Sequence, residues 1–428
     1  MTGATERFAR IARRRVAGGK GGIASICSAH PLVIEATLRH GTMHGADVLI
    51  EATCNQVNHE GGYTGMTPAA FRTFVEAHAA RASFPLDRLI LGGDHLGPNP
   101  WKHLPAAEAM QKAVAMIDAY AAAGFTKLHL DASMACAGDP PALADETIAA
   151  RAAELAAAAE AAVARTGGEK PVYIIGTEVP VPGGALEALD HMHVTEPADA
   201  LRTVEVHRQA FSRLGLDAAF ARAVGVVVQP GVEFGNADIV AYAPQKATKL
   251  VASLESMPQF VFEAHSTDYQ PAEALAALVR DGFAILKVGP WLTFALREAL
   301  YGLSSIADQL VPDPSREGLP AAMERVMLAS PGNWQKYYPG TPDEQRLQRH
   351  FSFSDRIRYY WPSPEAQHAT EALLAALGEK EIPRPLISQY LGHLDAGVGA
   401  GRIKPTAHEL LVASVTRVLD IYRGATNP

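Results

Sequence analysis

The chain has 428 residues, of which 48% are hydrophobic, and a formal net charge of −8. This composition allows a large buried core, and a barrel domain of about 250 residues would leave a sizeable remainder. The negative net charge and the lack of a long Lys/Arg-rich run beyond the Arg-rich N-terminus do not suggest nucleic acid or an anionic membrane as a partner. The sequence contains neither a secretory h-region nor an apolar run long enough to span a bilayer.

The three cysteines, Cys27, Cys54 and Cys136, are scattered and show no CxxC or zinc-finger spacing. Such cysteine usage is typical of proteins from a reducing compartment. We therefore expect a cytoplasmic protein.

Eight short apolar runs have the continuous hydrophobicity of parallel strands that are buried on both faces. In chain order they are Gly22–Ile26, Val48–Glu51, Leu89–Gly93, Lys127–Asp131, Val172–Glu178, Val224–Gln229, Phe260–His265 and Ala284–Val288. Helical patterns separate them; Thr67 and Pro68, for example, have the N-cap and N1 preferences of a helix start. This alternation predicts an α/β fold, a closed (β/α)8 TIM barrel. A doubly wound open sheet is the alternative, and the lack of an early GxGxxG motif disfavours it.

The chain beyond the eighth strand is predicted to be helical. Trp291–Leu310 has a helical pattern, and the apolar spacing of Glu365–Leu377 and Ala407–Tyr422 is also that of helices. No Ser/Gly-rich linker precedes these segments. We therefore predict a barrel over residues 1–310 and a helical extension over residues 311–428 that packs on the barrel.

Polar residues collect where the predicted strands end, which is where barrel enzymes carry their active sites. The residues at or just after these ends include Glu51, Asn55, Gln56, Asp94, His95, Asp131, Glu178, Gln229, His265, Asp268 and Lys287. A single carboxylate in such a place is usually a helix cap or an ion-pair partner. Polar groups at all eight ends are costly in an apolar barrel mouth unless they serve one another or a ligand.

Two histidines and a carboxylate form the natural metal set: His95, His265 and Glu178, with Gln229 as a fourth donor. Imidazole and carboxylate ligands suit zinc first, with manganese, iron or cobalt as alternatives. Asp94 adjoins His95 and is predicted either to move protons or to orient a ligand.

Further candidates follow from charge and position. Glu51 and Asp131 join Asp94 as candidate catalytic carboxylates, and Asn55, Gln56 and Asp268 are candidate substrate contacts. Lys287 ends an apolar strand, so it is either a Schiff-base nucleophile or a contact for the substrate or its phosphate, and we favour the contact.

The segment Ser352–Trp361 brings two arginines and two hydroxyls together beside aromatic residues. Ser354, Arg356 and Arg358 are therefore candidate phosphate contacts, because guanidinium forks recognise oxyanions in a bidentate manner. On a helix the two arginines would point about 200° apart, so only one is expected to reach a ligand. We favour Arg356, because Ser354 and Asp355 can form a turn that presents it. The alternative is an ion-pair cluster on a helix surface.

Long motifs along nearly the whole chain resemble the family of the Z-type subunit of class II D-tagatose-1,6-bisphosphate aldolase. They are Cys27–Pro31, Leu49–Thr53, Asn55–Asn58, Gly61–Met66, Gly92–Asn99, His129–Asp139, Gly176–Gly184, Val228–Phe234, Glu263–Gln270, Leu286–Pro290 and Ser354–Pro362. The resemblance implies either a stand-alone, metal-dependent epimerase that converts D-tagatose 6-phosphate to D-fructose 6-phosphate, or a non-catalytic partner of a separate aldolase subunit.

The resemblance also implies a small phosphorylated ketose as ligand, and we expect a homo-oligomer. Gln229 stands where a middle metal histidine of class II aldolases is expected, which departs from ordinary aldolase chemistry. An older family label is tagatose-6-phosphate kinase, but the sequence lacks the GxxxxGK[ST] phosphate loop.

Overall fold

The computed structural model describes residues 3–16, 21–179, 193–313 and 315–427. Eight parallel strands close into a barrel in the order β1-β10-β9-β6-β5-β4-β3-β2, which confirms the predicted fold. The barrel strands are β1 (Ile23–Cys27), β2 (Val48–Thr53), β3 (Leu89–Leu96), β4 (Lys127–Leu130), β5 (Val172–Ile175), β6 (Ala223–Val227), β9 (Val261–Ala264) and β10 (Ile285–Val288). A two-stranded hairpin, β7 (Glu233–Phe234) and β8 (Ile239–Val240), follows β6.

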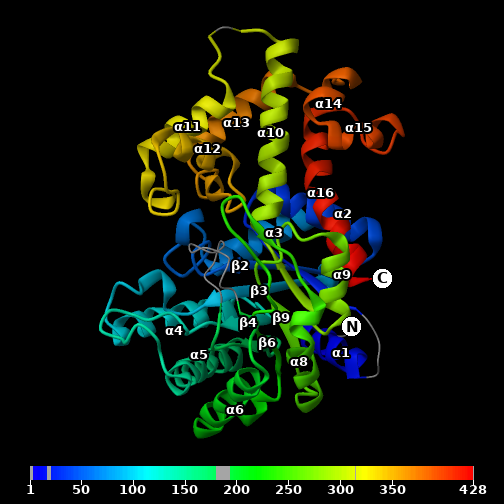
Figure 1. Cartoon of the computed structure of the whole chain (residues 1–428). Helices are drawn as coiled ribbons and strands as arrows, with labels where there is room; N and C mark the ends of the chain where they lie inside the picture. Colours follow the sequence, from blue (N-terminus) through cyan, green and yellow to red (C-terminus); the bar gives the residue numbers. More distant parts are fainter. Residues whose placement is uncertain (1–2, 17–20, 180–192, 314, 428) are drawn as a thin grey trace.

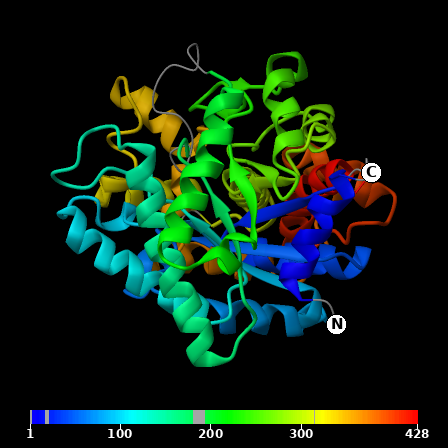
Figure 2. The ribbon, with the colours of Figure 1, turned by 90° about the horizontal axis from the view of Figure 1, so that it is seen from below.

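Helices surround the strands, and most of the helices after residue 310 gather at the top of the molecule in Figure 1, while Figure 2 views the protein from below. Thr67 caps α3 by accepting the N–H of Ala70, as its sequence predicts. The helices up to the end of the barrel are α1 (Ala4–Val16), α2 (Pro31–His44), α3 (Pro68–Arg81), α4 (Ala106–Ala122), α5 (Asp145–Thr166), α6 (Pro197–Arg213), α7 (Asp217–Phe220), α8 (Pro244–Ser253), α9 (Ala272–Arg280) and α10 (Pro290–Leu310). None of the helices in the described ranges is long and apolar enough to cross a membrane.

The helices of the C-terminal region lie partly away from the barrel. They are α11 (Leu319–Ala329), α12 (Pro342–Phe351), α13 (Pro364–Leu377), α14 (Arg384–Tyr390), α15 (Gly392–Gly399) and α16 (Ala407–Thr426). Helix α10 leaves the barrel and packs on α16 and on α11, α13 and α14, so it does not close the ring of outer helices.

Helix α16 takes the place that α10 leaves open. It packs against α2, α9 and β1, and the carbonyl of Thr426 accepts the N–H of Gly22 at 2.9 Å, directly before β1. Side chains such as Leu411 belong to the same hydrophobic core as the barrel. The domain boundary at residue 310 stays a prediction. Because α16 shares the core of the barrel, we propose that residues 311–428 do not fold on their own.

Leu411 tests this proposal because it is fully buried on α16. Replacing a buried leucine by alanine removes apolar contacts and leaves a cavity, so Leu411→Ala should lower the free energy of unfolding by about 2–5 kcal/mol. Urea unfolding followed by a probe in the barrel measures the change. Leu328→Ala is the control, since that side chain is 52% exposed and the expected effect is within about 0.5 kcal/mol. A barrel that keeps its stability in Leu411→Ala would show that the extension is independent.

Candidate active site

A cavity of about 80 Å³ opens at the carboxyl ends of the barrel strands. Many of the residues that the sequence singles out line it together: Asn55, Gln56, Asp94, His95, His265, Asp268, Lys287 and Arg358, with Cys27, Tyr63 and Tyr359 beside them. The strand ends therefore converge on one polar pocket. Nearly all of its ionisable groups are shielded from water, which strengthens their mutual electrostatics.

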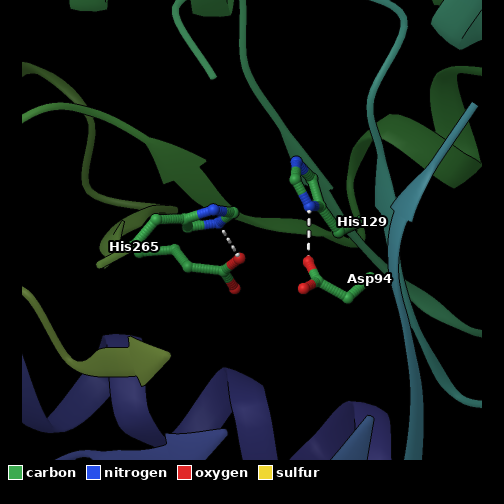
Figure 3. Close-up of side chains that lie close together, drawn as sticks. Asp94, His129 and His265 are labelled. Atoms are coloured by element: carbon green, nitrogen blue, oxygen red, sulfur yellow. Dashed lines mark hydrogen bonds and ion pairs between the residues drawn. The ribbon is translucent and has the colours of Figure 1, made fainter. Parts of the chain in front are cut away.

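Four side chains offer ligand atoms that lie within 4.8 Å of one another: Asp94, His129, Glu263 and His265. His129 Nδ1 lies 2.9 Å from Asp94 Oδ1, and His265 Nε2 lies 2.9 Å from Glu263 Oε1. Figure 3 shows Asp94 and His129 side by side, with His265 facing them. Burial lowers the pKa of His265 to about 3, so its imidazole is neutral, which is the form that binds metal.

His95 belongs to a second pair in the same pocket. Its Nδ1 lies 2.8 Å from Asp131 Oδ2, and its ring centroid lies 4.9 Å from that of His265 and 5.1 Å from that of His129. Although burial opposes the shift, hydrogen bonding with His95 lowers the pKa of Asp131 to about 2. Asp131 is thus an anion that orients His95. Although burial lowers the pKa of His95, Asp94 and Asp131 raise it overall.

The backbone of β3 explains how neighbouring residues reach one cavity. Adjacent residues of a regular strand face opposite ways, yet both Asp94 and His95 line the pocket. His95 has φ of 49°, and the pairing of β3 with β4 shifts register between Gly93 and Leu96. A bulge of this kind re-aims side chains next to active sites.

Two lysines compensate the buried carboxylates. Lys127 Nζ lies 2.6 Å from Glu51 Oε1 and 2.6 Å from Glu263 Oε2, and all three side chains are 0% exposed. Lys287 pairs with Glu51 and lies 2.7 Å from Asp94 Oδ1. The ion pairs therefore form a continuous network from the barrel interior to the pocket.

The charge state of Lys287 decides between its two predicted roles. Burial alone would lower the pKa of this amine, but Asp94 and Glu51 raise it well above its usual range. The amine is therefore protonated and is a poor Schiff-base nucleophile. This disfavours the Schiff-base role, and the contact of Lys287 with the substrate or its phosphate stays a prediction.

Two predicted metal ligands lie elsewhere. Glu178 is exposed and accepts a hydrogen bond from the hydroxyl of Thr195 at 2.9 Å, because β5 ends at Ile175 and the chain turns before Glu178. The side-chain oxygen of Gln229 accepts the N–H groups of Gly231 and Val232, so it closes a local turn. The expectation that these side chains join His265 is corrected by this geometry.

His129, Glu263 and Lys127 were not among the predicted ligands or contacts. A usable signal was present, since residues two apart on a strand share a face. Lys127 and His129 are separated by two positions, as are Glu263 and His265. Polar residues at this spacing within apolar strands indicate one inward-facing row.

The structure also corrects the preference for Arg356. The turn begins at Asp355, which has φ of 46°, and continues as a 3-10 helix over Arg356–Tyr359. Arg356 is buried against the ring of Tyr337, with its guanidinium carbon 3.3 Å from the ring centroid. Arg358 instead lines the pocket.

Other predicted contacts have structural partners as well. Asp268 lines the pocket, but its Oδ1 also accepts the N–H groups of Gly289 and Trp291 at the start of α10. Ser354 is buried, and its hydroxyl donates to Asn236 Oδ1 at 3.0 Å. Asp268 can thus both stabilise α10 and meet a ligand, whereas Ser354 mainly holds its own loop.

Comparison with known proteins extends this description. Residues 8–427 match the family described as D-tagatose-1,6-bisphosphate aldolase subunit GatZ/KbaZ-like. The chain belongs to this family. It is 55% identical over 416 residues, covering 97% of both chains, to a protein of Agrobacterium fabrum named D-tagatose 6-phosphate 4-epimerase. It is 50% identical over 418 residues to a protein of Salmonella newport named D-tagatose-1,6-bisphosphate aldolase subunit GatZ, which covers 98% of this chain and 99% of the relative.

A solved structure has the same fold. The crystal structure of a probable tagatose 6 phosphate kinase from Sinorhizobium meliloti 1021 is 58% identical in sequence, with a TM-score of 0.88. It covers 94% of this chain and 100% of its own. The fold of this GatZ/KbaZ-like protein is thereby shared with an experimental structure over almost its full length.

The buried lysine gives a test of the network in this family member. Lys127→Met would remove the nearest cation of the buried Glu263 and leave Glu51 with Lys287 alone, so it should lower the free energy of unfolding by about 3–5 kcal/mol. Chemical denaturation measures this loss. The exposed pair of Lys112 and Glu60 provides the control, because Lys112→Met should cost no more than about 1 kcal/mol. Equal, small losses of unfolding free energy in both variants would mean that the buried ion pairs contribute little to stability.

Proposed function

We propose that this chain is a metal-dependent enzyme that epimerises D-tagatose 6-phosphate at C4 to D-fructose 6-phosphate. The observation that carries the proposal is the cluster of three histidines, four carboxylates and two lysines at and beneath the barrel mouth. Such a concentration of buried ionisable groups is costly for a purely structural partner. The 55% identity to a protein named as this epimerase supports the choice of reaction.

The residues of the pocket fit a divalent ion. Asp94, His129, Glu263 and His265 supply two imidazoles and two carboxylates, a donor set that suits zinc, manganese, iron or cobalt. The Nε2 atom of His129 is buried and has no hydrogen-bond partner within the described ranges, which leaves a nitrogen free for a ligand. When bound, such an ion polarises the oxygens of a ketose as a Lewis acid.

Epimerisation at C4 can proceed by retro-aldol cleavage. A base takes the proton of the C4 hydroxyl, the C3–C4 bond breaks to give an aldehyde and an enediolate, the aldehyde turns over, and the bond re-forms with return of the proton. Asp94 and His95 line the cavity, and the proposal assigns this proton transfer to them. Asp131 acts through His95, and Glu51 through Lys287.

The ion-binding role is tested by metal content. His129→Ala and His265→Ala should each lose most of the bound metal, because each removes an imidazole nitrogen donor from the four-residue group. Elemental analysis of protein purified without chelator provides the measurement. Glu178→Gln is the matched control and should keep its metal, since Glu178 lies outside the group. Loss of metal from Glu178→Gln, with retention in both histidine variants, contradicts the assignment.

The substrate phosphate is proposed to bind at Arg358. Losing a charge-assisted contact costs about 1.5–3 kcal/mol, so Arg358→Ala should weaken the phosphorylated substrate by roughly one to two decades. Kinetics with D-tagatose 6-phosphate and D-tagatose side by side reveal whether the loss is specific to phosphate. Arg356→Ala is the comparison variant and should change both substrates alike, because Arg356 packs on Tyr337. Equal losses for both substrates in Arg358→Ala place the phosphate elsewhere.

The second candidate is an accessory subunit of a class II aldolase, favoured by the 50% identity to a relative named as such a subunit. Incubation of the purified chain with D-tagatose 6-phosphate, with and without EDTA, decides between them. Formation of D-fructose 6-phosphate that EDTA abolishes is expected for the epimerase. No conversion, together with co-purification of a second barrel protein, supports the accessory role. A homo-oligomeric state and a cytoplasmic location complete the proposal.

A further inference from the structure

A second cavity, of about 430 Å³, lies at the opposite end of the barrel from the active site. Its apolar floor includes Ile23, Leu49 and Ile90, which lie near the beginnings of β1, β2 and β3. Helix α1 covers this end of the barrel, and Phe8 packs into the core beneath it. The volume falls in the range of small-molecule pockets, about 300–1,000 Å³.

Arginines converge on this cavity from three parts of the chain. Helix α1 contributes Arg7, Arg10 and Arg14, the turn before β3 contributes Arg88, and α16 contributes Arg423. The chain as a whole is acidic, with a net charge of −8. The gathering of arginines at this cavity is therefore a local feature and does not reflect a basic composition.

The cavity offers little negative charge to balance Arg14, Arg88 and Arg423. Asp47 is the one carboxylate among the lining residues, and it is already paired with Arg7 at 3.0 Å. Among the residues that the structure describes, no carboxylate forms an ion pair or hydrogen bond with the guanidinium of Arg14, Arg88 or Arg423. The other titratable lining residue is His40, which faces Asp420 at 3.0 Å.

We propose that this cavity is a second binding site, for a small phosphate-bearing anion held by Arg14, Arg88 and Arg423. Guanidinium groups recognise phosphate through planar, bidentate hydrogen bonds. The cavity is concave and has an apolar floor. Such a shape suits a small molecule as the ligand, whereas an acidic protein partner would need a flatter surface. Because the three arginines come from α1, α16 and the turn before β3, a bound anion would join segments that are far apart in sequence.

Calorimetric titration of the metal-loaded full chain with inorganic phosphate, at constant ionic strength, tests the site. All proteins carry Arg358→Ala, so that the arginine proposed for the substrate phosphate is absent. We expect this background to bind phosphate, and Arg88→Ala with Arg423→Ala to weaken that binding about tenfold or more. Arg165→Ala is the control, because Arg165 is an exposed arginine paired with Asp118 on the outer helices.

The proposal is overturned if the Arg358→Ala background binds no phosphate at millimolar concentration, or if the two further substitutions change the affinity less than twofold. An equal loss in the Arg165→Ala control also overturns it, since that result indicates a general charge effect. The epimerase assay is independent of this titration. Arg88→Ala with Arg423→Ala in the otherwise native chain leaves the proposed catalytic pocket intact, so failure of one proposal is distinguishable from failure of the other.

Discussion

The ion pairs of Lys127 with Glu51 and Glu263 are the constraint on which the barrel interior depends. They join β4 to β2 and β9 with no exposure to water. Each charge is tolerable only because its partners lie at hydrogen-bond distance, since an unpaired ion in such surroundings is costly. The second oxygen of each glutamate is directed toward the pocket, where Glu51 meets Lys287 and Glu263 meets His265. The buried lysine thus sets the orientation of groups that face a ligand.

This arrangement separates the roles of the pocket residues. Asp94, His95 and His265 line the cavity, whereas Lys127 and Glu51 lie beneath it. The backbone at His95 is strained, because a non-glycine residue at positive φ costs of order 1–3 kcal/mol. Such a conformation persists only where the surrounding structure holds it. Strain and buried charge both indicate a site whose geometry is set before a ligand arrives.

The sequence was informative about the fold because parallel strands buried on both faces are continuous apolar runs, and all eight were found. It was less informative about side-chain partners. Glu178 follows an apolar run as closely as His265 does, but nothing in the sequence shows that β5 ends earlier, at Ile175. The choice of Arg356 over Arg358 assumed that a turn at Ser354 and Asp355 presents Arg356 to the ligand. The chain does turn at Asp355, but in the 3-10 helix that follows Arg356 packs on Tyr337 and Arg358 lines the pocket. Such local backbone choices depend on tertiary packing.

The position of α16 has a consequence for the order in which the protein is made. Strand β1 leaves the ribosome long before the helix that covers it, because α16, with Thr426 bonded to Gly22, lies far along the chain from β1. Until then the gap between α2 and α9 exposes apolar surface of the barrel. Partly synthesised chains therefore expose an aggregation-prone hydrophobic surface, and the need for chaperones is greatest during this interval of translation.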